Sequence, residues 1–169
     1  MKIRLFNIDT DFDFLKSWDN DERIHAMWSA NRIGYPLERA NLQQVLDEIR
    51  DRFGDEAFVA VTDDDSVVGF FCYSLNNENK EGMLKFVIVA PQCRGKGIAE
   101  EMIKLALAEV FDNPVTRAVQ LNVFSENIRA KKFYEKVGFK ERSTAENAFA
   151  YKDENWDRCN MVIENYILV

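Results

Sequence analysis

Two glycines and two cations stand between a predicted buried strand and a predicted helix, and they have the clearest chemical potential in the chain. The segment comprises Gln92, Cys93, Arg94, Gly95, Lys96, Gly97, Ile98 and Ala99. A helix start presents unsatisfied backbone N–H groups and the positive end of the helix dipole, and glycines let the backbone close around an anion. The two cationic side chains add positive charge. The segment predicts a phosphate-binding loop, while a plain chain turn stays open.

The glycine spacing distinguishes between known phosphate-binding loops. It fits neither the GxxxxGK[ST] loop nor the dinucleotide fingerprint GxGxxG. The pattern Q/R-x-x-G-x-G/A resembles the signature loop of the GNAT superfamily, with Gln92, Gly95 and Gly97 at its three defining positions. In that family, backbone amides of the loop hold the pyrophosphate of acetyl-CoA. The resemblance therefore implies acetyl-CoA as the cofactor.

A second motif follows in the expected order. The residues from Leu121 to Asn127, then Ala130, then the run Phe133–Phe139 resemble the second GNAT signature. By that resemblance Asn127 hydrogen-bonds the cofactor arm, and the Tyr134 phenol lies beside the thioester sulfur and protonates the departing thiolate. The residue types alone also allow Asn127 to be a plain helix cap and Tyr134 to be a buried aromatic on a helix face.

The strand before the loop completes the predicted cofactor site. In GNAT proteins this strand splays from the next one, and the pantetheine arm inserts between them as a pseudo-strand. The resemblance thus implies Tyr134 as the catalytic residue. The implied cofactor-binding residues are Phe86, Val87, Ile88, Val89, Arg94, Gly95, Lys96, Gly97, Ile98, Ala99, Asn122 and Asn127.

The general base is not assigned by the sequence. An amine attacks a thioester as the neutral species, yet a lysine amine has a pKa of about 10 and an α-amine a pKa of about 8. Some relatives use a glutamate where this chain has Asn122. Glu22, His25, Glu81 or a water chain are the alternatives. His25 is the only histidine and has a suitable ordinary pKa, although its charged neighbours favour a solvated surface position.

Composition narrows the class of protein. The chain has 169 residues, 47% apolar and 30% charged, which predicts one globular domain over 1–169. Three scattered cysteines suggest neither disulfides nor a metal site, and a cytoplasmic location fits them. The net charge of -7 disfavours nucleic acid and favours a cationic substrate. Neither a signal peptide nor a membrane span is expected.

Hydrophobic periodicity predicts the remaining elements. Strands are expected at 2–6, 57–62, 67–75, 83–89 (buried on both faces) and 118–124, and residues 139–169 should supply two more, the last at about 161–167. Helices are expected up to Trp28, capped by Asp11 or Asp13, and at 37–53, 97–110 and 127–137. The connection 143–158 shows no clear pattern. The expected fold is α+β: one GNAT-type domain with a mixed central sheet, a splayed strand pair and flanking helices.

The identity of the acceptor is the part of the function that the sequence determines least. The aromatics of segment 27–36 form either core or cleft wall, and with Trp156 they resemble the branch of ribosomal-protein N-terminal acetyltransferases, which also includes enzymes acting on polyamines, antibiotics and metabolites. The predicted function is acetyl transfer from acetyl-CoA directly to a primary amine of a small molecule or a protein N-terminus. An acyl-CoA-binding regulatory module without catalysis is the alternative, and a nucleotide-binding or structural domain is a third. The sequence leaves open whether the protein forms a homodimer.

Overall fold

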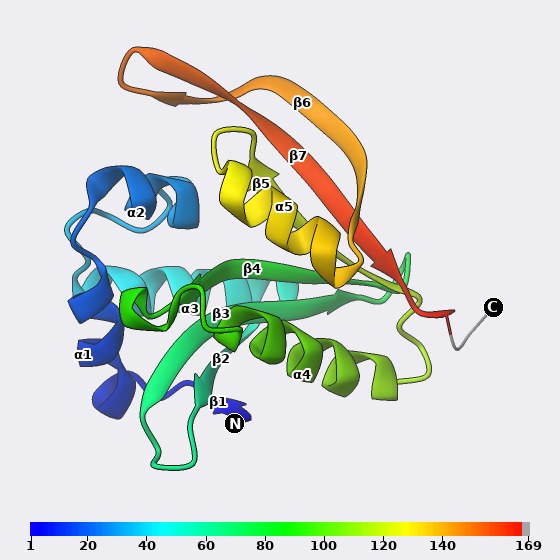
Figure 1. Ribbon diagram of the computed structural model, residues 1–169, viewed down its shortest axis with the longest axis horizontal. Helices are drawn as coiled ribbons and strands as arrows, with labels where there is room; N and C mark the ends of the chain where they lie inside the picture. Colours follow the sequence, from blue (N-terminus) through cyan, green and yellow to red (C-terminus); the bar gives the residue numbers. More distant parts are fainter. Residues whose placement is uncertain (167–169) are drawn as a thin grey trace.

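The computed structural model describes residues 1–166 and contains one mixed sheet flanked by helices (Figure 1). The described strands are β1 (Lys2–Leu5), β2 (Glu56–Val61), β3 (Val67–Asn76), β4 (Glu81–Val89), β5 (Ala118–Phe124), β6 (Lys140–Tyr151) and β7 (Glu154–Glu164). The described helices are α1 (Ile8–Trp18), α2 (Glu22–Ser29), α3 (Arg39–Phe53), the 3₁₀ turn η1 (Pro91–Cys93), α4 (Ile98–Asp112) and α5 (Ile128–Val137).

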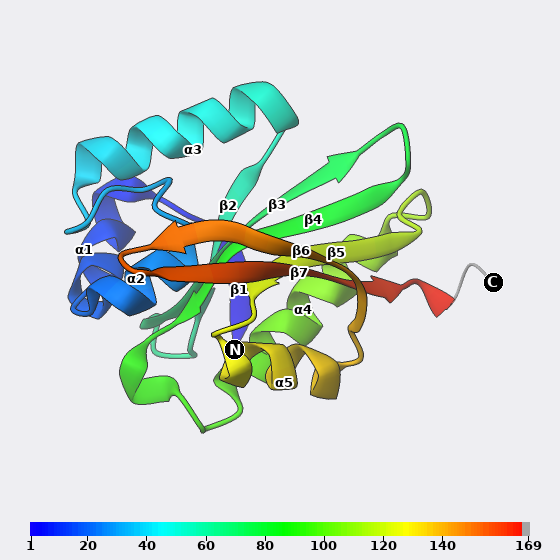
Figure 2. The ribbon, with the colours of Figure 1, turned by 90° about the horizontal axis from the view of Figure 1, so that it is seen from above.

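The strand order in the sheet is β1-β2-β3-β4-β5-β7-β6. Neighbouring strands are antiparallel except β4 and β5, which are parallel and are joined through the crossover helix α4. The view from above places α3 on one side of the sheet and α4 with α5 on the other (Figure 2). This mixed topology with two covered faces is the predicted α+β arrangement.

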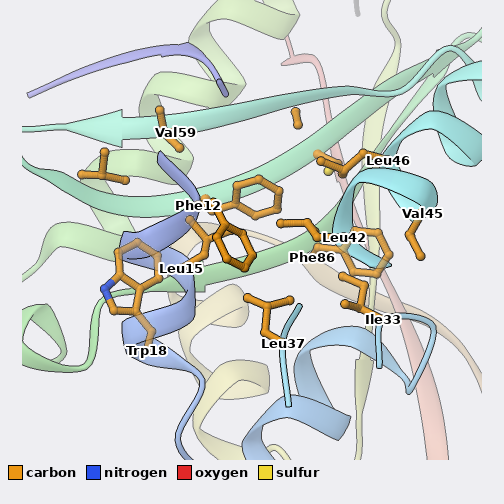
Figure 3. Packing of buried hydrophobic residues seen from close by; sticks show 14 of the residues in the cluster. Phe12, Leu15, Trp18, Ile33, Leu37, Leu42, Val45, Leu46, Val59 and Phe86 are labelled. Carbon is orange, nitrogen blue, oxygen red and sulfur yellow. The ribbon is translucent and has the colours of Figure 1, made fainter. Parts of the chain in front are cut away.

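Two apolar cores hold the helices to opposite faces of the sheet. On one face Phe12 and Leu15 of α1 pack with Leu42 and Leu46 of α3 against the sheet, as the close view shows (Figure 3). On the other face α4 buries a stripe with helical spacing against β1, β3 and β4: Met102, Ile103, Ala106, Leu107 and Val110. Complete burial of one such side chain contributes about 1.5–3 kcal/mol, so these stripes fix where each helix lies.

A third, smaller cluster joins α2 to the hairpin of β6 and β7. Ala26 of α2 packs with Phe124, Tyr151 and Trp156. The Trp156 side chain is completely buried, and its ring lies against the rings of Tyr151 and Phe124. The last two strands thus reach back to the first part of the chain.

Several sequence-based expectations need correction. Neither Asp11 nor Asp13 is the N-cap of α1, because both lie inside the helix; Asn7 caps α1 and Asp21 caps α2, while the buried Asp11 carboxylate binds Arg4 and accepts from the Asn7 N–H. The strand β4 is not buried on both faces: it alternates up to Phe86, beyond which its side chains are half-buried. Most of segment 143–158 is strand, within the β6–β7 hairpin. The last strand ends at Glu164, and residue 167 of its predicted range lies outside the described residues.

No helix within residues 1–166 combines the length and the apolar character needed to cross a lipid bilayer.

Candidate active site

The strands β4 and β5 separate midway along their length, which confirms the predicted splayed pair. They pair in parallel from Glu81 opposite Ala118 to Leu84 opposite Leu121, and pairing ends there. A cleft of about 560 Å³ opens where they part, lined on one side by Lys85–Val89 and on the other by Asn122 and Val123. The backbone edge of β4 in this cleft is thus left without a strand partner.

A β-bulge shapes this free edge of β4. The register between β3 and β4 shifts between the pairs Phe70–Ile88 and Cys72–Lys85, and Phe86 has a φ of 50°. A positive φ is unfavourable for a bulky side chain and persists only where neighbours hold it. Here the indole N–H of Trp28, on α2, donates to the Phe86 carbonyl oxygen at 2.7 Å. Trp28 itself lines the cleft, so α2 contributes directly to its wall.

The glycine loop lies at one end of the cleft. Gly95 and Gly97 have φ of 76° and 80°, and a Cβ at either position would meet nothing within 4 Å. Glycine is therefore required by the backbone conformation and not by crowding within the protein. Helix α4 begins directly after Gly97 without a side-chain cap, which leaves its first N–H groups open to a ligand. The loop has the form expected of an anion cradle.

Two arginines converge on this cradle. Arg94 lines the cleft, and burial lowers its pKa, as does the nearby positive charge of Arg129. Cations repel one another at such short range, so the pair favours an anionic ligand between them. Arg129, on α5, also lines the cleft and was missed by the sequence analysis, because nothing in its local pattern shows that α5 begins opposite the loop. Lys96 is exposed and Ile98 packs on a core, so neither side chain lines the cleft.

Helix α5 brings both predicted residues of the second motif to the cleft. Asn127 caps the helix, with its Oδ1 accepting from the Ala130 N–H at 3.2 Å. The Tyr134 side chain is only 7% exposed, packs against Phe133 and Phe139, and still lines the cleft. Burial raises the pKa of the Tyr134 phenol, so the group stays protonated at neutral pH and is able to donate a proton.

The three candidate bases do not line the cleft. The expectation that His25 is a solvated surface group is wrong: it is buried, with Nδ1 2.6 Å from Asp19 Oδ1 and Nε2 2.9 Å from the Ile33 carbonyl oxygen. Glu22 pairs with Lys152 at 2.8 Å.

Glu81 is committed to contacts at the far end of β4. Its two carboxylate oxygens accept from Gln120 and Arg142, each at 2.8 Å. Both oxygens of Glu81 are therefore engaged in structural hydrogen bonds, and the general base is none of these three residues.

Amide side chains cover the sheet beside the cleft. Gln120 and Asn122 of β5 lie on the same face as Asn160 of β7, which stands opposite Asn122 in the sheet. Asn160 Nδ2 donates to Asn122 Oδ1 at 3.1 Å and to Gln120 Oε1 at 3.0 Å, while the Arg142 guanidinium donates to Asn160 and Gln120. We call Gln120, Asn122 and Asn160 the amide row. Asn122 is its exposed member and lines the cleft.

Helix α2 forms the remaining wall, and the β6–β7 hairpin holds this helix in place. The Arg23 guanidinium binds both carboxylate oxygens of Glu154 and lies 5.0 Å from the centre of the Trp156 ring. One turn further along α2, Met27 and Trp28 line the cleft. Of the aromatics in segment 27–36, Trp28 is cleft wall, while Tyr35 is exposed and does not line the cleft; Trp156 is core.

Comparisons with known proteins agree with this geometry. The sequence model described as the acetyltransferase (GNAT) family matches residues 13–139. The peptidyl-lysine N-acetyltransferase YjaB of Salmonella typhimurium is 33% identical over 126 residues, 72% of this chain and 78% of that protein. The prophage-derived uncharacterized N-acetyltransferase YokL of Bacillus subtilis is 30% identical over 122 residues, 71% of this chain and 66% of that protein.

The spermidine N-acetyltransferase from Vibrio cholerae, solved in complex with CoA and spermine, has the same fold. It aligns with a TM-score of 0.80 at 23% identity, covering 96% of this chain and 94% of that chain. The narrower resemblance to ribosomal-protein N-terminal acetyltransferases stays a prediction. The match over residues 13–139 spans both motifs, and with it the chain belongs to the acetyltransferase (GNAT) family and is an N-acetyltransferase that takes acetyl-CoA as its acyl donor.

Proposed function

We propose that this N-acetyltransferase passes the acetyl group from acetyl-CoA directly to a primary amine while both are bound. The proposal rests on the observation that one continuous cleft is lined by Tyr134, the free edge of β4 and the glycine loop. The diphosphate of the donor binds the open N–H groups of the loop and the first turn of α4, between Arg94 and Arg129. This placement points the rest of the donor along β4.

The pantetheine arm binds along the free backbone edge of Lys85–Val89. Its amide groups replace the missing strand and pair with the N–H and C=O groups that β5 does not reach. Asn127 uses its Oδ1 as a helix cap, and its Nδ2 is available to donate to the arm. Both open readings of Asn127, helix cap and cofactor ligand, are compatible in this arrangement.

The thioester then lies within reach of the Tyr134 phenol. The amine nitrogen forms a bond to the carbonyl carbon, and the resulting oxyanion accepts hydrogen bonds from backbone N–H groups at the β4 bulge. The carbon–sulfur bond breaks, the thiolate takes a proton from Tyr134, and the extra proton that the nitrogen releases returns through water to the Tyr134 phenolate. The products are the acetylated amine and CoA.

Replacing Tyr134 with phenylalanine tests this assignment. We expect Tyr134→Phe to lower kcat by about 10²–10⁴-fold while the Kd for acetyl-CoA, measured by calorimetry, changes little. Tyr166→Phe, at an exposed tyrosine, is the matched control and should leave both quantities unchanged. Full turnover in Tyr134→Phe would remove the phenol from the mechanism. Tight acetyl-CoA binding by the unaltered protein, with no turnover on any amine, would instead identify the alternative acyl-CoA-binding module.

Cytoplasmic location and a homodimer remain predictions of the sequence.

A further inference from the structure

We infer that His25 is a positioning residue of this N-acetyltransferase, an inference that rests on the proposed function above. Held as an imidazolium between Asp19 and the Ile33 carbonyl, its ring fixes the indole of Trp28. Trp28 in turn holds the edge of β4 along which the donor is proposed to bind. Two observations carry the inference: both ring nitrogens of His25 face hydrogen-bond acceptors, and the same ring packs against Trp28.

The contacts of the two ring nitrogens determine how many protons the His25 ring carries. Nδ1 lies 2.6 Å from Asp19 Oδ1, and Nε2 lies 2.9 Å from the Ile33 carbonyl oxygen. A carbonyl oxygen cannot donate, so Nε2 carries a proton. Imidazole is ordinarily more basic than a carboxylate, so the proton between Asp19 and the ring belongs to Nδ1. Because a neutral ring has only one N–H, His25 is an imidazolium paired with the Asp19 carboxylate.

This ion pair joins three segments of the chain. The His25 side chain is completely buried, and that of Asp19 is 5% exposed. Asp19 ends α1, and its second oxygen, Oδ2, accepts from the Leu37 N–H at 2.6 Å. His25 belongs to α2, while Ile33 and Leu37 lie between α2 and α3. Buried charges are stable only when they are paired and hydrogen-bonded, so the pair holds these three segments in one arrangement.

The His25 ring transmits this arrangement to the cleft through Trp28. It meets the Trp28 ring edge to face, with 5.6 Å between the ring centres, and the Tyr35 ring at 5.3 Å. Because two hydrogen bonds prevent the His25 ring from turning, Trp28 packs against a fixed surface. The Trp28 indole N–H then donates to the Phe86 carbonyl oxygen at the bulge of β4. Trp28 lines the cleft and His25 does not, so His25 acts on the donor edge through Trp28.

Nuclear magnetic resonance of the untagged protein tests the protonation directly, because His25 is the only histidine of the chain. We expect two ring N–H signals from the folded protein in the buffer of the binding measurements. In Asp19→Asn the side-chain amide is able to donate to Nδ1, so the Nδ1–H signal should be lost while the Nε2–H signal stays. A single ring N–H signal in the unaltered protein overturns the inference.

A double-mutant cycle tests whether His25 acts through Trp28. His25→Phe keeps a ring beside Trp28 and removes both ring N–H groups. We expect it to raise the Kd for acetyl-CoA, measured by calorimetry, about 5-fold in the unaltered background and by less than about 2-fold in the Trp28→Phe background. Tyr35→Phe, which keeps the other ring that contacts His25, is the control and should leave this Kd unchanged.

A third variant separates positioning from stability. His25→Phe leaves the Asp19 carboxylate without its cation and should lower the thermal midpoint. Adding Asp19→Asn removes that charge and should recover much of the midpoint while the Kd stays raised, because the ring still lacks its hydrogen bonds. Recovery of the Kd together with the midpoint overturns the inference, as does full additivity of His25→Phe and Trp28→Phe. An unchanged Kd in Trp28→Phe alone overturns the proposed placement of the donor along β4, and the inference with it.

Discussion

The indole N–H of Trp28 and the carbonyl oxygen of Phe86 are joined by a 2.7 Å hydrogen bond that ties α2 to the bulge of β4. The two residues are far apart in the sequence, and their rings also meet edge to face. Phe86 holds an unfavourable positive φ at the point where the backbone of β4 turns toward the cleft. Thus a residue of α2 holds the strand edge along which the proposed function places the donor.

Replacing Trp28 with phenylalanine keeps an aromatic ring and removes the hydrogen-bond donor. We expect Trp28→Phe to raise KM for acetyl-CoA about 5-fold, because a hydrogen bond of this kind contributes about 1 kcal/mol and the bulge loses its anchor. Tyr35→Phe, which alters an exposed ring near α2, should leave this KM unchanged. Steady-state kinetics over donor concentration measure the effect, and equal KM values in both variants would contradict it.

The αL glycines of the loop can be compared with an αL glycine elsewhere. Gly97 and Gly54 have similar φ values of 80° and 71°, and a Cβ added to either would meet no atom within 4 Å. Alanine at either position should lower the unfolding free energy by about 1–2 kcal/mol through backbone strain alone. Gly97→Ala should also weaken acetyl-CoA binding by about 10-fold, because Gly97 belongs to the glycine loop. Gly54→Ala should not, because Gly54 ends α3 away from the cleft. Chemical denaturation and calorimetry test the two halves separately.

The buried phenol predicts the alkaline side of the pH profile. The neutral phenol is the form that donates a proton, and burial raises the pKa of Tyr134 above its ordinary value of 10.0. The competent form therefore persists as the pH rises through 10. We expect kcat at saturating donor and acceptor to show no loss between about pH 8 and 10. A fall with a midpoint below 10 would show that another group supplies the proton or that the phenol is more solvated.

The contact between Arg23 and Glu154 predicts an acid-sensitive attachment of α2. The hydrogen bond from Arg23, followed by that from Trp156, lowers the pKa of Glu154 from 4.5 to about 2. A lowered folded-state pKa stabilises the fold above the unfolded value, and this stabilisation is lost as the pH falls from about 4.5 toward 2. Glu154→Gln should lower the thermal midpoint at pH 7 and lose its difference from the unaltered protein near pH 2.

The same variant should also raise KM for the amine, because α2 lines the cleft. Glu22→Gln is the matched control, since Glu22 joins the same two elements through the exposed Lys152. It should have the smaller effect on both midpoint and KM, because exposed pairs contribute little. A larger effect of Glu22→Gln would contradict the role given to Arg23 and Glu154.

The buried pair of Lys85 and Asp55 predicts a large loss of stability. Lys85 Nζ lies 2.5 Å from Asp55 Oδ2, the Asp55 side chain is fully buried, and Asp55 Oδ1 has no partner among the described residues. Lys85→Met leaves this carboxylate without its cation, which costs about 3–5 kcal/mol. The double variant with Asp55→Asn should recover much of that loss in chemical denaturation. No recovery would show that Lys85 stabilises through its packing on Phe53 instead.

The sequence predicted those helices and strands best in which burial imposes a regular spacing of apolar residues. The stripe from Met102 to Val110 identified α4, and the αL glycine Gly138 marked the end of α5, because both reflect local packing and backbone angles. The hairpin of β6 and β7 gave little signal for the opposite reason: residues 141–148 are exposed throughout, so no alternation is imposed.

Long-range contacts explain what the sequence missed at the site. His25 stands next to charged residues in the chain, yet it is buried because Asp19 and the Ile33 carbonyl satisfy its ring nitrogens. Arg129 belongs to the cleft because α5 starts beside the glycine loop, a relation that no local pattern encodes. The family motifs indicated residues that line the cleft, whereas α2, which also lines it, is remote from both motifs.

The separation of β4 and β5 leaves a gap in the sheet that the donor is proposed to fill. Beyond Leu84 the sheet is incomplete, and the pantetheine arm would supply the missing strand. Ligand binding to the native state adds RT ln(1 + [L]/Kd) to its stability, about 2.7 kcal/mol at a hundredfold excess over Kd. Amide hydrogen exchange at Lys85–Val89 should consequently slow on adding acetyl-CoA, and the chain should be most rigid when loaded and loosen each time CoA departs.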